Sequence, residues 1–116
     1  MAELTQQAIR KAGVADLDAA LTAAAAAGDS VDYSSGQFIV VKNGDSGSHV
    51  VTIAAPDSTT DTGNLGLLAV ADIAVTVAAG DYAFIAVPPG YAQSGAVAWT
   101  YDDETSVTVG VFGVNP

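Results

Sequence analysis

The feature that most constrains the fold is an alternation of apolar and polar side chains that recurs from residue 36 to the C-terminus. Valine, isoleucine and threonine dominate these segments, and glycine, aspartate and proline separate them. Successive side chains of a β-strand point to opposite faces of a sheet, so this spacing predicts strands that each bury one face. Six strands are expected, at residues 37–42, 48–53, 73–77, 82–87, 96–101 and 106–112.

Short connections between these segments predict hairpins. The turns at 43–47, 79–81 and 102–105 are rich in Asn, Asp and Gly, which are typical turn residues. Short, hairpin-linked strands with no convincing helix between them imply two antiparallel sheets packed together. The expected fold class is therefore all-β, an antiparallel β-sandwich or a jelly-roll-like small barrel of about six to eight strands with an N-terminal arm.

Residues 1–35 have a different character and are expected to form an N-terminal arm with an Ala-rich segment, while residues 36–116 form the sandwich domain. Leucines at i and i+4 and a run of alanines favour a helix, but one turn of leucines is too narrow a stripe to cover a sandwich. An arm that contacts another subunit fits better. The interface candidates are Leu4, Ile9, Arg10, Lys11, Leu17 and Leu21.

The charge balance is strongly acidic, with 13 Asp and Glu against 3 Lys and Arg and a net charge of −10. Because half of the residues are hydrophobic, the chain folds and this charge lies on its surface. Such a surface repels nucleic acid and anionic lipid, so neither is an expected partner. The composition is typical of proteins that work in concentrated salt, although calcium-binding or very soluble extracellular proteins share it.

No motif for catalysis or for a cofactor stands out, so the chain is expected not to be an enzyme. There is no cysteine, no Gly-x-Ser-x-Gly nucleophile elbow and no phosphate-binding loop. His49 is the only histidine, and within a strand it is expected to be an ordinary exposed or hairpin-facing side chain. The acidic run at residues 102–104 is interpreted as a solvated hairpin tip.

Two binding hypotheses remain open from single residues. Asp57 and Asp61 are weak candidates for a structural cation, because their loop lacks the ligand spacing of an EF-hand. A sugar-binding face would use the aromatic residues Trp99, Tyr101, Tyr82 and Tyr91. A single tryptophan in a small sandwich is more typical of the core, and we expect it to be buried between the sheets.

Several segments resemble a group of small β-rich proteins of tailed bacterial and archaeal viruses that serve as capsid decoration or minor head proteins. The most distinctive are the Phe-x-Val-x-Lys-Asn-Gly segment at 38–44 and the Val-Thr-Val-x-Ala-Gly turn at 75–80, within a similarity that extends over residues 28–112. The resemblance implies a non-enzymatic virion protein on the outer capsid surface, bound to the major capsid protein as a homo-oligomer, with a trimer favoured. The unusual acidity fits a haloarchaeal host. The alternative is a carbohydrate-binding or adhesion module of a tail or surface fibre.

Overall fold

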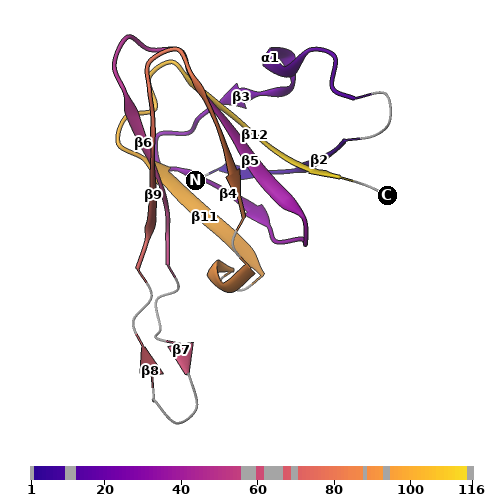
Figure 1. Cartoon of the computed structure of the whole chain (residues 1–116), viewed down its shortest axis with the longest axis vertical. Coiled ribbons are helices and arrows are strands. Elements are labelled where there is room, and N and C mark those ends of the chain that lie inside the picture. The colour runs from indigo at the N-terminus through magenta and orange to yellow at the C-terminus, as the bar shows by residue number, and fades with distance from the viewer. Residues whose placement is uncertain are drawn as a thin grey trace.

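The computed structural model describes residues 2–9, 13–55, 60–61, 67–68, 71–87, 89–92 and 95–114, with the backbone alone at 60–61, 67–68, 89 and 114. Two five-stranded sheets face one another, and a small two-stranded sheet lies on a hairpin that projects from them (Figure 1). The expected all-β sandwich is confirmed. Within the described residues, no helix is long and apolar enough to cross a membrane.

The first sheet contains, in spatial order, β1 (Ala2–Leu4), β4 (Asp29–Asp32), β11 (Ala96–Tyr101), β6 (His49–Ile53) and β9 (Ile73–Val77). The second sheet contains β10 (Tyr82–Ala86), β5 (Gln37–Asn43), β12 (Val107–Val114) and β2 (Gln6–Ile9), and β3 (Thr22–Ala23) also pairs with β12. All six expected strands are present. The sheets are not purely antiparallel, because β1 pairs with β4 and β2 pairs with β12 in parallel.

The core lies between the sheets and follows the alternation seen in the sequence. Trp99 is fully buried, as predicted, among inward-facing aliphatic side chains of both sheets. Strand β5 of the second sheet is unusual because Val40, which faces away from the core, is as buried as its neighbours Ile39 and Val41. The sequence of a strand that is covered on both faces is typically a continuous run of apolar residues.

The three expected hairpins are wrong, and each of those connections instead crosses from one sheet to the other. β5 and β6, β9 and β10, and β11 and β12 are consecutive along the chain, yet no such pair is hydrogen-bonded. We call the end of the sandwich formed by the crossing loops 44–48, 78–81 and 102–106 the corner end. The same turn residues that close a hairpin also permit a corner, so local composition does not separate the two.

Asn43 explains why the loops of the corner end cross between the sheets. Its fully buried side-chain amide donates to the carbonyl oxygens of Gly47, at 2.8 Å, and Val77, at 3.0 Å, and accepts from the backbone N–H of Asp45 at 3.0 Å. Its backbone N–H donates to the carbonyl oxygen of Asp81, and its backbone carbonyl accepts from the N–H of Gly80. One side chain thus joins the end of β5 to the end of β9 on the opposite sheet.

The one long hairpin of the sandwich is formed by β6 and β9, paired from His49–Val77 to Ile53–Ile73. The small sheet of β7 (Thr60–Asp61) and β8 (Leu67–Leu68) lies on the connection between them and projects from the body (Figure 1).

The N-terminal residues form part of the sandwich and not a separate arm, which corrects the expected division at residue 36. Their strands lie in both sheets, which therefore hold ten strands instead of six to eight. Helix α1 (Leu17–Ala20) begins with the Asp16 carboxylate accepting from the backbone N–H of Ala19. Leu17 and the buried Leu21 pack on the outer face of the second sheet, which is why Val40 is buried there.

Candidate functional site

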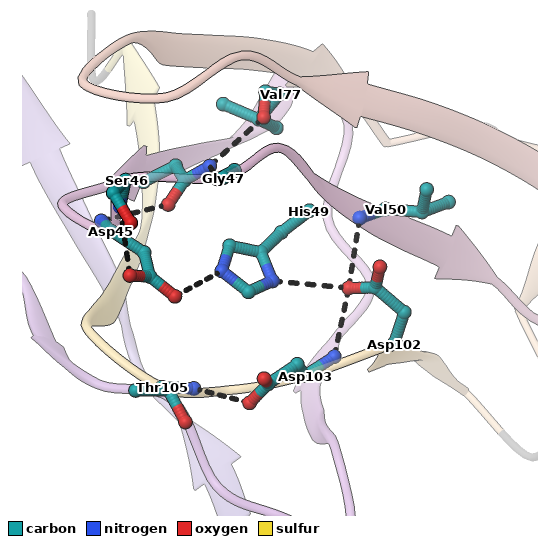
Figure 2. Close-up of polar contacts among 10 residues, drawn as sticks. Asp45, Ser46, Gly47, His49, Val50, Val77, Asp102, Asp103 and Thr105 are labelled. Carbon is teal, nitrogen blue, oxygen red and sulfur yellow. Dashed lines mark hydrogen bonds and ion pairs between the residues drawn. The ribbon is translucent and has the colours of Figure 1, made fainter.

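A polar cluster centred on His49 lies at the corner end. Its Nε2 atom lies 3.0 Å from Asp45 Oδ2, and its Nδ1 atom lies 3.3 Å from Asp102 Oδ1 (Figure 2). The side chain of His49 is only 7% exposed, whereas those of Asp45 and Asp102 are 33% and 48% exposed. The imidazole is therefore held between two loops by carboxylates that reach solvent.

This geometry favours the doubly protonated imidazolium. A carboxylate only accepts hydrogen bonds, so both ring nitrogens of His49 must carry a proton for both contacts to form. The hydrogen bond to Asp45 raises the pKa of His49, burial opposes this, and the hydrogen bond to Asp102 raises it further. His49 was expected to be an ordinary strand side chain, and the structure corrects this to a buried ionic link.

The two carboxylates are held ionised by more than the histidine. The backbone N–H of Ser46, followed by His49, lowers the pKa of Asp45. The backbone N–H of Val50 has the largest effect in lowering the pKa of Asp102, whose Oδ1 accepts that bond at 2.9 Å. The acidic run at 102–104 is thus not merely solvated, because Asp102 joins loop 102–106 to β6.

The cluster is suited to hold two loops together and not to catalyse a reaction, and we call His49, Asp45 and Asp102 the clamp. A general base needs a free ring nitrogen near neutral pH, and here both nitrogens face carboxylates. Among the described residues no hydroxyl hydrogen-bonds to His49, and no group of three or more His, Asp or Glu side chains is arranged to hold a metal ion. The arrangement instead ties loop 44–48 to loop 102–106.

A second polar chain runs through the core. The indole N–H of Trp99 donates to Tyr101 Oη at 2.8 Å, and the Tyr101 hydroxyl donates to Asp29 Oδ2 at 2.6 Å. Burial, followed by the hydrogen bond to Asp29, strongly raises the pKa of Tyr101. Asp29 is fully buried, and its Oδ1 has no hydrogen-bond partner within the described protein. This chain links β11 to β4 inside the first sheet.

Of the three large hydrophobic side chains that are exposed in the described residues, two lie on the outer face of the second sheet and the third is Val14. Phe84 is 65% exposed and Tyr82 is 41% exposed, both on the edge strand β10. The ring of Phe38 stacks between Phe84 and Phe112, with 6.0 Å between centroids on each side. We call Phe112, Phe38 and Phe84 the aromatic row.

The residues predicted for binding do not form one site. Trp99 is buried, so it does not line the sugar-binding face that was one of the two open hypotheses, and the hydroxyl of Tyr91 donates to the carbonyl oxygen of Ala71. Asp57 lies outside the described residues, and only the backbone of Asp61 is described, so the cation hypothesis is untested there.

The interface candidates lie partly within the chain's own packing. Leu4 packs against the main core, and Ile9, Leu17 and Leu21 pack on the outer face of the second sheet. Arg10 and Lys11 lie outside the described residues. A role in contacts with another subunit stays a prediction for these six residues.

Sequence reasoning missed the cluster at the corner end because its parts are distant in sequence. Asp102 is 53 residues from His49, and no local pattern joins them. The single local signal is the spacing of Asp45 and His49 across the 44–48 loop.

Comparisons with protein-family models, curated proteins and solved structures find no match to this chain.

Proposed function

We propose that this chain is a non-enzymatic structural protein of a virion, bound to the outer capsid surface of a tailed virus as a homo-oligomer. The observation that carries the proposal is that the polar clusters are used within the chain, whereas large aromatic side chains are left exposed. The polar clusters join loops and strands to each other, while the two most exposed large hydrophobic side chains of the described residues, Phe84 and Tyr82, lie together on one edge strand. Exposed aromatic residues of this kind favour protein–protein contact.

The resemblance over residues 28–112 supports the same role and gives the major capsid protein as the partner. A small domain gains little affinity from one contact, but linked copies on a symmetric lattice gain by multivalency. The net charge of −10 supports a high-salt environment, since salt screens repulsion between bound copies.

The test is addition of the purified chain to capsids from which this protein has been stripped, at molar salt. We expect saturable co-sedimentation at a fixed ratio to the major capsid protein. A matched variant, Phe84→Ser, checks whether the exposed aromatic residue contributes. If the wild-type chain stays in the supernatant at every concentration, the proposal is refuted, and binding to a glycan array in its place would support the adhesion alternative.

A further inference from the structure

We propose that β10 pairs with β10 of a second copy of this chain, antiparallel and across a two-fold axis at Phe84, so that the second sheets of two copies join into one. The proposal concerns how copies associate in solution, and it does not depend on binding to a capsid. It rests on the free edge of β10, on the absence of charge along that strand, and on a self-complementary register.

The backbone of β10 offers unpaired groups at alternate residues. The backbone N–H of Asn43 donates to the carbonyl of Asp81, and the N–H of Val87 donates to the carbonyl of Gln37. In an antiparallel pair the bonded positions alternate, so the odd-numbered residues of β10 bond β5. The N–H and C=O groups of Tyr82, Phe84 and Ala86 therefore point away from β5, and within the described part of the chain no residue is hydrogen-bonded to them.

This edge lacks the devices that proteins use to prevent strand pairing. Residues 82–86 contain no charged residue and no proline, and they form a regular five-residue strand. The opposite edges of the two sheets are β1 and β2, which are shorter and carry Glu3, Gln6 and Gln7. Short, polar edges resist pairing, whereas a longer uncharged edge is a template for another strand.

The other uncharged edge, β9, is a poorer surface for association. Its exposed side chains are the small Ala74 and Thr76. β10 instead presents Tyr82 and Phe84, and large aromatic residues dominate the energetics of interfaces.

A second copy of the chain fits this edge better than a basic partner would. With Phe84 opposite Phe84 of the partner copy, each Tyr82 lies opposite the small Ala86, and all three open residues exchange backbone hydrogen bonds. The carboxylate of Asp18 accepts from the hydroxyl of Tyr82 at 2.7 Å and pairs with Lys42 at 3.2 Å. The strand therefore offers no unpaired charge for a basic partner to recognise.

Self-pairing also keeps like charges apart. Asp81 lies opposite Val87 of the other copy, so the two Asp81 residues are separated by about 20 Å along the strands. This exceeds the Debye length of about 10 Å at 0.1 M salt. The remaining repulsion comes from the net charge of −10 on each copy, so association should strengthen as salt increases.

The absence of cysteine in the chain allows a direct test by disulfide formation. In the proposed register the Cα atoms of two copies of residue 84 are about 5.5 Å apart, within the range of a disulfide. The Cα atoms of two copies of residue 86 are about 14 Å apart, outside that range. Under mild oxidation at molar salt, full-length Phe84→Cys should give about tenfold more cross-linked dimer than Ala86→Cys.

Two further variants make the result decisive. Thr76→Cys places an exposed thiol on the other uncharged edge, β9, and preferential cross-linking of that variant would overturn the proposal. Equal yields from Phe84→Cys and Ala86→Cys would also overturn it. Sedimentation of the wild-type chain should show an 11.5 kDa monomer in low salt and a species of twice that mass in molar salt. Phe84→Lys should remain monomeric in molar salt, with circular dichroism showing that the variant is folded. A trimer, or a monomer at every salt and protein concentration, would refute two-fold pairing without bearing on capsid binding.

Discussion

Replacing Tyr101 by Phe should destabilise the protein substantially, because this hydroxyl joins two buried groups. It accepts from the Trp99 indole N–H and donates to the buried carboxylate of Asp29. A hydrogen bond to a charged group contributes about 1.5–3 kcal/mol and a neutral one about 0.5–1.5 kcal/mol. Oδ1 of Asp29 already has no partner among the described residues. Without the Tyr101 hydroxyl, the carboxylate keeps a single hydrogen bond, from the backbone N–H of Ala25 to Oδ2 at 3.3 Å.

The expected loss is therefore about 2–4 kcal/mol of unfolding free energy, which corresponds to a fall in Tm of roughly 8–16 °C for a chain of this size. Urea denaturation at fixed molar salt, followed by the emission of Trp99, measures it. The matched control is Tyr33→Phe, because the Tyr33 hydroxyl makes no hydrogen bond in the part of the chain that the structure describes and its ring also packs on the core. If both variants unfold at the same urea concentration, the buried hydrogen-bond chain does not stabilise the fold.

Three further predictions address the core, the corner end and the surface. Trp99 emission should be blue-shifted and shielded from iodide, and Trp99→Ala should cost about 3–5 kcal/mol by circular dichroism; ready quenching in the wild type would contradict burial. Because the folded-state pKa of His49 is raised above 6.5, its contribution is fully present below that pH and lost as pH rises through the folded pKa, so the urea midpoint should fall across that window in the wild type but not in His49→Gln. Tm should rise from low to molar sodium chloride as screening weakens carboxylate repulsion, whereas a rise specific to millimolar calcium would direct attention to Asp57 and Asp61.

The strands were predictable because their signal is local. The spans expected at 73–77 and 96–101 match β9 and β11 residue for residue, and three others differ from β5, β6 and β10 by one residue at one end. The span expected at 106–112 differs most, because β12 begins one residue later and ends two residues later. Alternation reports which side chains are buried, and burial is what a two-sheet core demands of every strand. It does not report the sheet to which a strand belongs.

Strand partners depend on contacts between distant residues, and this is where the sequence prediction failed. A turn rich in Asn, Gly and Asp at 43–47 suits a hairpin, and it becomes a corner because Asn43 donates to Val77, 34 residues away. The clamp has the same origin, since His49 acquires its role only when loop 102–106 folds beside it. A buried polar side chain that satisfies several backbone groups can decide between two topologies that local propensity leaves equal.

The N-terminal leucines show how a thin apolar stripe can cover enough of the second sheet and still leave one aromatic ring exposed. Leu17 and Leu21 need to cover only the strip of Val40 and Phe112 on the outer face of the second sheet, so one helical turn is enough. The two leucines do not extend over Phe84, the last residue of the aromatic row. Exposure rises along the row from 1% at Phe112, through the partly buried Phe38, to 65% at Phe84. The length of the N-terminal cover thus leaves one aromatic ring free beside an unpaired strand edge, and a longer helix reaching over Phe84 would remove the surface through which we expect two copies to pair.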